Sequence, residues 1–503
     1  MKSISQQRAR RPEPPPRAVV VCALVLIAAL GLFIGCDIAG RPIALWDESR
    51  LAVNALEMSQ RGFSLVTTYG LQPDLWNTKP PLLIWLEAGS IDLFGATEWA
   101  VRLPSLLAAL ATLALVMRFS WRLGGSWFVA AAAPTILAFS PGFFGQHAAQ
   151  SGDYEALLCL FTTAYVLLLF RLLHRRRPDA WRVLACGLLV AGACLTKGIA
   201  GLAPGVGVAV YALVRWRWPR LFQTPWYLVA GMLFLVLVGG YYLIREHLGP
   251  GYLAAVRANE LGARYMRGMN GHVWPAYYYL NVLGQDFGPG WAYVGLAIAP
   301  FLRFGRNKSA AFATYAFIVI PALVLVFSLS RTKIFWYIVP VYPLLAILFA
   351  IVLDRLIQIL ARGPRSLAAA YLVVAIGAGY LVLNALNAKF VVLPPSEDND
   401  QGRYGQLFAA LQARGERRVE TIDSGVANND NLQDYTPQRR FYTLAWRARG
   451  LDIGEANPDD DPVLVKGRVL ATCDPSLRAA VRALGPSAAD VPGCVAVGRS
   501  GGG

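Results

Sequence analysis

The sequence predicts a polytopic all-α membrane protein that ends in a small α/β domain. Of the 503 residues, 56% are hydrophobic and only 16% are charged, a balance that soluble domains do not have. Apolar runs of about 20 residues, the length that a helix needs to cross a bilayer, recur between short polar loops. After Lys389 the composition becomes polar and the runs become short. The net charge of +16 is expected from loop orientation rather than from binding to nucleic acid.

Residues 1–17 are proline-rich and basic, and they predict a cytoplasmic tail. The first span is expected at residues 18–36. Residues 37–98 are too interrupted to span, so we expect amphipathic helices that lie on the membrane. The further spans predicted within a transmembrane domain of residues 18–388 are 99–117, 127–144, 154–170, 183–196, 198–214, 226–244, 276–302, 310–329, 334–353 and 367–388. The total is about 11–13 helices, because glycines and a proline near Phe287 could split or add one.

The charges of the loops predict the orientation. One set of alternate loops holds 21 Lys and Arg in 60 residues, and the opposite set holds 11 in 104. Loops rich in Lys and Arg stay in the cytoplasm. The N-terminus is therefore expected in the cytoplasm, and the C-terminal segment is expected in the periplasm of a bacterial inner membrane.

Residues 389–503 predict the periplasmic α/β domain. Helices are expected over Tyr404–Arg414 and near Leu477–Leu484. The expected strands are Val419–Ile422, Phe441–Trp446, Val463–Ala471 and Val495–Val497. Cys473 and Cys494 are the only cysteines of this domain, and an oxidising periplasm would let them form a disulfide.

Charged residues gather at the outer ends of different spans, while the spans themselves carry few charges. The residues in question are Asp47, Glu48, Arg50, Lys79, Asp153, Lys197, His272, Arg331 and Lys333. An ion or lipid-translocation pathway would need ionisable groups at depth, which disfavours a flippase. The pattern favours chemistry on a lipid-linked phosphate at the outer leaflet. Cations can bind a phosphodiester, and a carboxylate can accept a proton or hold a divalent cation.

Each of these residues also has a purely structural interpretation. Asp47 and Asp153 stand where helix N-caps are expected. Lys79, Lys197, Arg331 and Lys333 could anchor at lipid headgroups, and His272 could bond to a loop carbonyl. Three further arginines of the outer loop could steer anionic lipid or simply be solvated: Arg257, Arg264 and Arg267.

Six short motifs in order resemble the bacterial lipid A aminoarabinose transferases, GT-C glycosyltransferases related to the protein O-mannosyltransferases. The motifs are Asp47-Glu48-Ser49-Arg50, Lys79-Pro80-Pro81-Leu82, Asp153 before the fourth span, Leu195-Thr196-Lys197-Gly198, His272 with Pro275, and Ser330 to Pro340 with Lys333 and Tyr337. One such motif is weak evidence. Six in order on one side of the membrane are strong evidence.

The resemblance implies a GT-C fold and the transfer of one sugar from a polyprenyl (undecaprenyl) phosphate donor to lipid A or another periplasmic glycolipid or glycan. Inversion and a monomer are expected. The implied catalytic residues are Asp47, Asp153 and Glu48. The implied ligands of donor phosphate are Arg50, Lys79, Lys197, Arg331, Lys333 and Tyr337. His272 and Asp153 are the implied ligands of a divalent metal ion.

One departure from the family pattern concerns the sugar. The aminoarabinose transferases usually carry Glu directly before Lys-Pro-Pro, and here Thr78 takes that place. A neutral sugar or a uronic acid is therefore an alternative to the aminosugar. A protein O-glycosyltransferase of the same fold remains the alternative enzyme.

Overall fold

The computed structural model describes residues 17–287 apart from 125, 146, 176 and 269–270, then 308–360, scattered positions between 368 and 386, and 400–424, 435–456 and 467–498. Within these ranges, seven stretches are long and apolar enough to cross a membrane. They are Arg17–Gly35, Glu98–Leu123, Tyr154–Leu173, Ala180–Val214, Trp226–Leu248, Lys308–Leu329 and Phe335–Ile359. The predicted polytopic helical architecture is therefore confirmed.

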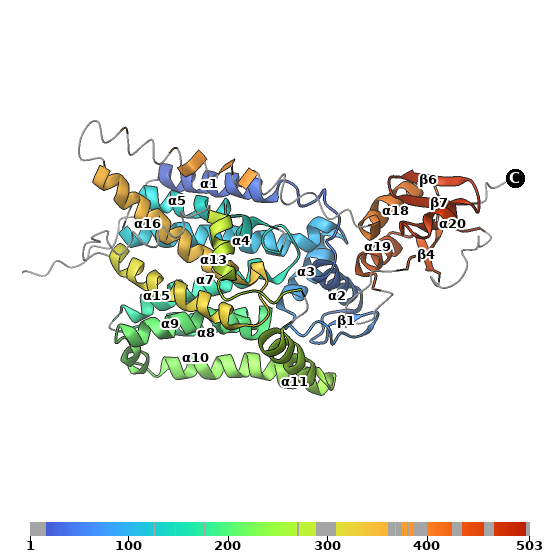
Figure 1. Ribbon diagram of the computed structural model, residues 1–503. Helices are drawn as coiled ribbons and strands as arrows, with labels where there is room; N and C mark the ends of the chain where they lie inside the picture. The colour runs from blue at the N-terminus through green and yellow to red at the C-terminus, as the bar shows by residue number, and fades with distance from the viewer. Residues whose placement is uncertain are drawn as a thin grey trace, which may run out of the picture.

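The long helices run side by side and form one bundle (Figure 1). Its helices are α1 (Arg17–Gly35), α4 (Glu98–Gly124), α5 (Trp127–Ala138), α7 (Tyr154–Leu173), α8 (Ala180–Lys197), α9 (Ala203–Val214), α10 (Trp226–Phe234), α11 (Gly240–Leu248), α15 (Lys308–Leu329) and α16 (Tyr342–Leu360). Buried side chains from many of these helices, including Leu113, Phe170, Tyr315 and Leu345, form one continuous apolar core.

Several predicted spans differ in detail from the structure. The span predicted at 127–144 divides into the 12-residue helix α5 and a short helix, α6 (Pro141–Phe144). The spans predicted at 183–196 and 198–214 are joined by a 3-10 turn over Gly198–Leu202, where Gly198 adopts a φ of 56°. Most of the spans predicted at 276–302 and 367–388 lies outside the described residues, although α13 (Tyr278–Phe287) begins the first of these.

Between the first span and α4, the chain forms two helices and a small hairpin at one end of the bundle. These are α2 (Asp47–Arg61), β1 (Thr68–Tyr69), β2 (Gln72–Pro73) and α3 (Leu82–Phe94). Two acidic residues begin α2 and Arg61 ends it, which suits the helix dipole at both ends. The helices predicted within 37–98 are thus present. Figure 1 shows this region between the bundle and the C-terminal domain.

The C-terminal domain is a five-stranded sheet with helices, as the sequence predicted in outline. The strands are β3 (Arg418–Thr421), β4 (Asp452–Glu455), β5 (Val469–Thr472), β6 (Ser487–Val491) and β7 (Cys494–Val497), in the order β4-β3-β5-β7-β6. Strand β3 pairs in parallel with β4 and β5, and β7 pairs antiparallel with β5 and β6. The helices are α18 (Tyr404–Ala413), α19 (Pro437–Arg447) and α20 (Arg478–Arg482).

The strand predicted at Phe441–Trp446 is wrong, because this stretch lies in helix α19. Pro437 opens the helix at its first turn, where a missing N–H costs nothing. Phe441, Tyr442 and Ala445 then fall on one buried face at helical spacing and pack in the cluster that includes α2. The period of the apolar residues is therefore helical.

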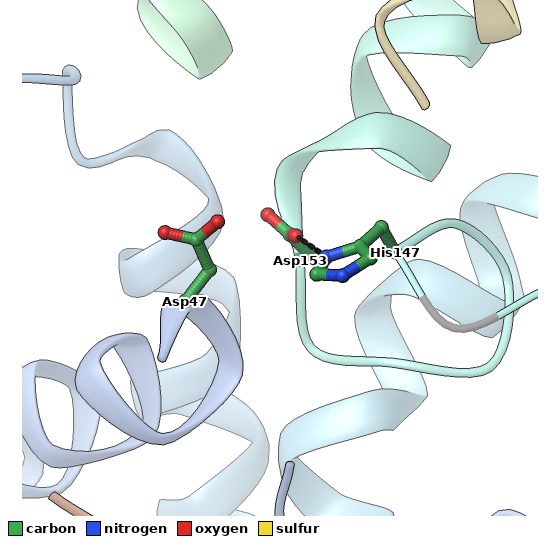
Figure 2. Close-up of side chains that lie close together, drawn as sticks. All are labelled: Asp47, His147 and Asp153. Atoms are coloured by element: carbon green, nitrogen blue, oxygen red, sulfur yellow. Dashed lines mark hydrogen bonds and ion pairs between the residues drawn. The ribbon is translucent and has the colours of Figure 1, made fainter. Parts of the chain in front are cut away.

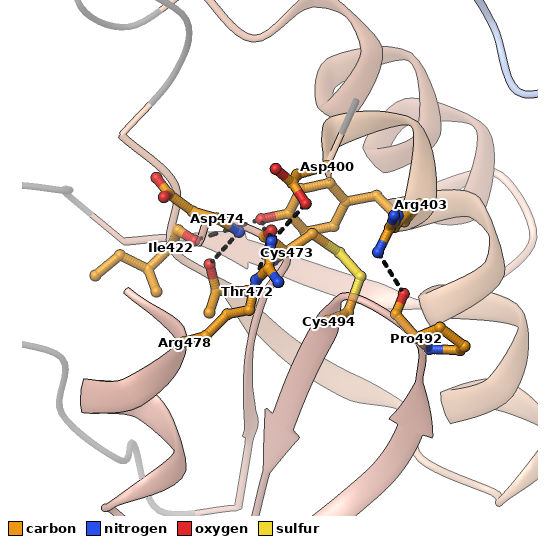
Figure 3. The surroundings of a disulfide bond; sticks show 10 residues. Asp400, Arg403, Ile422, Thr472, Cys473, Asp474, Arg478, Pro492 and Cys494 are labelled. Carbon is orange, nitrogen blue, oxygen red and sulfur yellow. Dashed lines mark hydrogen bonds and ion pairs between the residues drawn. A yellow bond between two sulfur atoms is a disulfide. The ribbon is translucent and has the colours of Figure 1, made fainter. Parts of the chain in front are cut away.

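The predicted disulfide between Cys473 and Cys494 is present. It joins the end of β5 to the start of β7, with a sequence separation of 21. Figure 3 shows that Arg478 pairs with Asp400 beside it and that Arg403 donates to the Pro492 carbonyl. These contacts fix η7 (Asp400–Arg403) and α20 against the sheet edge.

Candidate active site

Two aspartates and a histidine converge at the end of the bundle. Asp47 is the first residue of α2, Asp153 directly precedes α7, and His147 lies in the loop before it. One ligand atom from each of the three lies within 4.8 Å of the others. Figure 2 shows the two carboxylates facing each other, with His147 on the far side of Asp153.

Asp153 is held from two directions. Its Oδ1 accepts the backbone N–H of Tyr154 at 2.6 Å, so the expected N-cap exists. Its Oδ2 accepts from His147 Nδ1 at 2.8 Å. Burial raises the pKa of this carboxyl, but the hydrogen bond and charge of His147 outweigh burial and lower the pKa below its usual value. Asp153 therefore stays ionised beside Asp47.

His147 was not singled out by the sequence. Its ring stacks on Trp336 at 3.5 Å between centroids, so its orientation is fixed as well as its hydrogen bond. The only available signal was its place six residues before Asp153, in the same outer loop. The predicted metal ligand His272 is not part of this group, since its carbonyl accepts from the backbone of Lys333 and its loop pairs Val273 with Thr332. The histidine beside Asp153 is His147.

Asp47 does not cap α2, contrary to the structural interpretation of its position. Trp46 occupies the cap position and makes no side-chain cap, with a φ of 73° that L-residues rarely adopt. The Trp46 ring stacks on Tyr435 of the C-terminal domain at 5.4 Å. This strained turn places Asp47 at the start of α2, with its carboxylate directed at Asp153 (Figure 2).

Glu48 points into the protein rather than at Asp47. It forms a buried ion pair with Arg102 at 2.6 Å and accepts the N–H groups of Ala44 and Gly152. Burial raises the pKa of Glu48, but Arg102 and these hydrogen bonds outweigh burial and lower it. In this geometry Glu48 contacts Arg102 and the residue that precedes Asp153, and these contacts do not direct it at Asp47.

Arg50 likewise forms an ion pair within the protein, with Asp74. Its guanidinium makes two hydrogen bonds to Asp74, at 2.9 and 2.8 Å, and lies 3.6 Å from the Tyr69 ring centroid. A phosphate would have to displace a buried bidentate carboxylate. The predicted role of Arg50 as a phosphate ligand therefore does not fit this geometry.

Three cations lie near Asp47, of which Lys79 and Lys197 are buried and Arg264 is partly exposed. Lys79 lies above the Tyr154 ring at 5.5 Å, Lys197 lies above the Tyr337 ring at 4.9 Å, and the Arg264 guanidinium donates to the Tyr337 hydroxyl. Each of the three is close enough to Asp47 to interact with it electrostatically. Lys79, Lys197 and Tyr337 were predicted at this site. Arg264 was considered only as a residue that steers lipid.

Two carboxylates partly balance these cations. Glu155, in the first turn of α7, pairs with Lys197. Glu260 lies 3.8 Å from Arg264 and accepts a hydrogen bond from Thr78. Neither residue was a predicted site residue. Glu155 lies 42 residues from Lys197, and Glu260, although only four residues from Arg264, lies 182 residues from Thr78.

The two remaining predicted phosphate ligands lie at the edge of the site. Arg331 is exposed. The Lys333 ammonium donates to the carbonyl of Ser330 at 2.6 Å, and its backbone N–H donates to His272. These contacts tie the loop before Phe335 to the loop of His272. They do not direct either cation at Asp47.

The arrangement therefore combines two chemical functions. Asp47 and Asp153 can accept a proton or hold a cation, and the three cations beside them can neutralise a phosphate. Asp47, His147 and Asp153 form a donor set that suits a divalent ion. In the present geometry, however, Asp153 and His147 already satisfy each other through their hydrogen bond.

Comparison with known proteins agrees with this chemistry. The family model described as dolichyl-phosphate-mannose-protein mannosyltransferase matches residues 78–242. The undecaprenyl phosphate-alpha-4-amino-4-deoxy-L-arabinose arabinosyl transferase of Pectobacterium carotovorum is 29% identical over 67% of this chain and 60% of its own length. An uncharacterised Aquifex aeolicus protein is 26% identical over 65% of this chain and 62% of its own length. The matched part thus spans less than two thirds of these relatives.

The fold is also shared with a solved structure. ArnT from Cupriavidus metallidurans bound to undecaprenyl phosphate superimposes with a TM-score of 0.65 at 19% identity, over 96% of this chain and 99% of that one. The same protein in the apo state gives a TM-score of 0.64. The resemblance predicted from the motifs is therefore confirmed, and the chain has an ArnT-like GT-C fold.

Proposed function

We propose that this protein is a membrane glycosyltransferase that moves one sugar from undecaprenyl phosphate to lipid A or another periplasmic glycolipid or glycan, with inversion. One observation carries the proposal. The group formed by Asp47, His147 and Asp153 lies near three cations at one end of the bundle, two of them buried and one partly exposed. The curated aminoarabinose transferases, whose names specify undecaprenyl phosphate, support the choice of donor.

The proposed reaction breaks the bond between the sugar C1 and the phosphate oxygen, and forms a bond between C1 and the acceptor oxygen. Undecaprenyl phosphate leaves with the electron pair. Lys79, Lys197 and Arg264 stabilise its negative charge through charge-assisted hydrogen bonds. If the acceptor is a hydroxyl, Asp47 takes its proton as general base. If it is a lipid A phosphate, already anionic, Asp47 orients the groups.

Asp153 and His147 are proposed to support Asp47. Asp153 places a second carboxylate beside Asp47, within reach of the same ligand. His147 fixes the position of Asp153. If the reaction requires a divalent cation, these three residues are the ones that would hold it. A transfer assay with and without EDTA tests that requirement.

The proposed location is the bacterial inner membrane, with residues 1–17 in the cytoplasm and the active site and residues 389–503 in the periplasm. The bias of Lys and Arg in the loops supports this orientation. The disulfide of the C-terminal domain supports it independently, because such bonds persist in oxidising compartments. We propose that the enzyme acts as a monomer, with residues 18–388 as the catalytic domain.

Mass spectrometry of lipid A and periplasmic glycans, from cells with and without the gene, tests the function. We expect one sugar mass to disappear from a lipid or glycan and to return with the wild-type gene. A sugar lost instead from a periplasmic protein would support the O-glycosyltransferase alternative. No change in lipid, glycan or protein, in cells that contain the donor, would contradict a transferase.

A further inference from the structure

Glu260 brings a carboxylate to the position next to Lys79 from a distant part of the chain. It lies in the π-helical segment Arg257–Arg267, more than 180 residues after Thr78 in sequence. The Thr78 hydroxyl nevertheless donates to Glu260 Oε1 at 2.9 Å. Helices of the π type are rare and are frequently found at functional sites. The side chain of Glu260 is 19% exposed, so the carboxylate is largely enclosed but still reachable.

The charges around Glu260 keep it ionised. Burial raises the pKa of its carboxyl, but Lys79 and Arg264, with the Thr78 hydrogen bond and Lys197, outweigh burial and lower the pKa. Glu260 therefore adds one negative charge among the cations that are proposed to bind the donor phosphate. That charge weakens their hold on an anionic ligand, so it lowers phosphate affinity rather than raising it.

The carboxylate of Glu260 is not needed to hold Arg264 in place. Arg264 already donates to the Tyr337 hydroxyl, and its distance to Glu260 is 3.8 Å, at the outer limit of an ion pair. Both contacts of Glu260 use Oε1. Among the described residues, neither contact uses Oε2, so this oxygen can accept a hydrogen bond from a ligand that lies beside the cations.

We propose that Glu260 is a specificity-determining residue that accepts a hydrogen bond from a hydroxyl or ammonium group of the donor sugar. The sugar must lie between the phosphate, which the cations bind, and the acceptor, which Asp47 faces. Glu260 and Asp47 both act electrostatically on Lys79 and Arg264, so Glu260 lies beside the same cations as Asp47. A neutral sugar or an aminosugar can donate to its carboxylate, whereas the carboxylate of a uronic acid is repelled. This proposal rests on the proposed function.

The proposal also accounts for Thr78. A threonine hydroxyl that donates to Glu260 Oε1 orients the carboxylate without altering the charge of the site. Of the sugar classes left open by the sequence, this arrangement favours the neutral and amino sugars over the acidic class, whose carboxylate Glu260 would repel.

The test compares the full-length wild type with Glu260→Gln and Thr78→Val in detergent. Transfer is measured with polyprenyl-phosphate donors that carry a neutral sugar, an aminosugar or a uronic acid. The binding of undecaprenyl phosphate alone is measured separately. Gln can still accept the hydrogen bond from Thr78, so Glu260→Gln removes charge with little change in shape.

For Glu260→Gln we expect kcat/KM with the preferred donor to fall about 10-fold or more, as for loss of a charged hydrogen bond. Undecaprenyl phosphate should bind as tightly as to the wild type, or more tightly. The use of the uronic acid donor relative to the others should rise. Thr78→Val should change the donor ratios in the same direction by a smaller factor, because the carboxylate remains but is less well oriented.

Two results would overturn the assignment. Weaker binding of undecaprenyl phosphate to Glu260→Gln would show that Glu260 merely supports the cations. Unchanged donor ratios, with a wild type that transfers sugar, would refute recognition by Glu260 and leave the proposed function standing. A wild type that transfers none of the donors would contradict both.

Discussion

Lys79 shows how burial tunes a single cation of this site. The residue is only 7% exposed and lies over the Tyr154 ring. Burial lowers the pKa of its ammonium below 10.5, and the positive charge of Arg264 lowers it further. The carboxylates of Glu260 and Asp47 oppose this lowering but do not cancel it, so Lys79 loses its proton at a lower pH than an exposed lysine would.

This lowered pKa predicts a pH dependence of donor binding. As pH rises toward the ordinary lysine value of 10.5, Lys79 loses its charge before an exposed lysine would, and the affinity for undecaprenyl phosphate should fall. Lys79→Met should bind undecaprenyl phosphate about 10-fold or more weakly at neutral pH. The part of the pH dependence that comes from Lys79 should be absent in this variant. The measurement is a binding titration of undecaprenyl phosphate at several pH values.

Lys79→Arg is the matched control, because a guanidinium keeps its charge throughout this range. It should move the loss of affinity to higher pH. The same pH profile in wild type, Lys79→Met and Lys79→Arg would contradict a role for Lys79 in phosphate binding and return it to anchoring at the membrane surface.

At the scale of elements, one buried ion pair ties together the parts that carry the two aspartates. Glu48 of α2 pairs with Arg102 of α4, and Arg102 also donates to the carbonyls of Ile38, Arg41 and Pro42. Glu48 in turn accepts the N–H of Gly152, next to Asp153. The relative position of Asp47 and Asp153 therefore depends on this pair.

Glu48→Gln should lower the free energy of unfolding by about 3–5 kcal/mol, because it leaves the Arg102 guanidinium buried without a counter-charge. The folded pKa of Glu48 is lowered, so its stabilisation is present above the unfolded value of about 4.5 and is lost as pH falls toward the folded value. Thermal unfolding in detergent at neutral pH and near pH 4 measures both effects. The variant should be less sensitive to acid than the wild type.

Glu87→Gln is the control for this experiment. Burial, aided by the charges of Glu48 and Asp153, raises the pKa of Glu87 well above its usual value, so its surroundings favour the neutral form. A glutamine there should change stability little. If Glu48→Gln proved as stable as Glu87→Gln at neutral pH, the Glu48–Arg102 pair would not hold the elements together.

The sequence predicted those site residues whose position follows from topology. Asp153 and Lys197 lie at the ends of predicted spans, and Asp47 and Lys79 lie in the loop between the first two predicted spans, so all four were expected on one side of the membrane. The apolar lengths likewise predicted the bundle. Topology alone could not assign partners, because the Arg102 and Asp74 that bind Glu48 and Arg50 lie 54 and 24 residues away.

His147 and Glu260 could not be predicted for the same reason. Neither residue belongs to one of the six motifs. The place of His147 follows from its hydrogen bond to Asp153, and that of Glu260 follows from the packing of the segment Arg257–Arg267 against Thr78. In the C-terminal domain, the apolar run at Phe441 was short enough to suit either a strand or a helix. Packing of α19 against the cluster that includes α2 decided the question.

At the scale of the whole molecule, the C-terminal domain supports the active site through the turn before Asp47. The Tyr442 hydroxyl accepts the N–H of Ile43 at 3.0 Å, and Arg440 pairs with Glu57 of α2 at 3.3 Å. Tyr435 stacks on Trp46, whose positive φ is an unfavourable conformation for tryptophan. Such strain costs about 1–3 kcal/mol and persists only where surrounding contacts enforce it.

Tyr435→Ala should therefore release the turn and misplace Asp47. We expect sugar transfer to fall about 10-fold or more, because displacements of about 1 Å at a reacting group have large effects on rate. Undecaprenyl phosphate binding should stay within a few-fold, since the cations belong to other elements. Tyr435→Phe keeps the ring and should retain most of the activity. Equal activity of the Ala and Phe variants would show that the C-terminal domain does not position Asp47.

The most direct test of the whole account is sugar transfer by Asp47→Asn, measured together with the binding of undecaprenyl phosphate. Asparagine keeps the shape of the side chain but cannot accept a proton or carry charge. The account predicts that transfer falls about 100-fold or more, whereas undecaprenyl phosphate still binds and the protein stays folded. Near-normal transfer by Asp47→Asn would contradict the central claim that this carboxylate acts in the reaction.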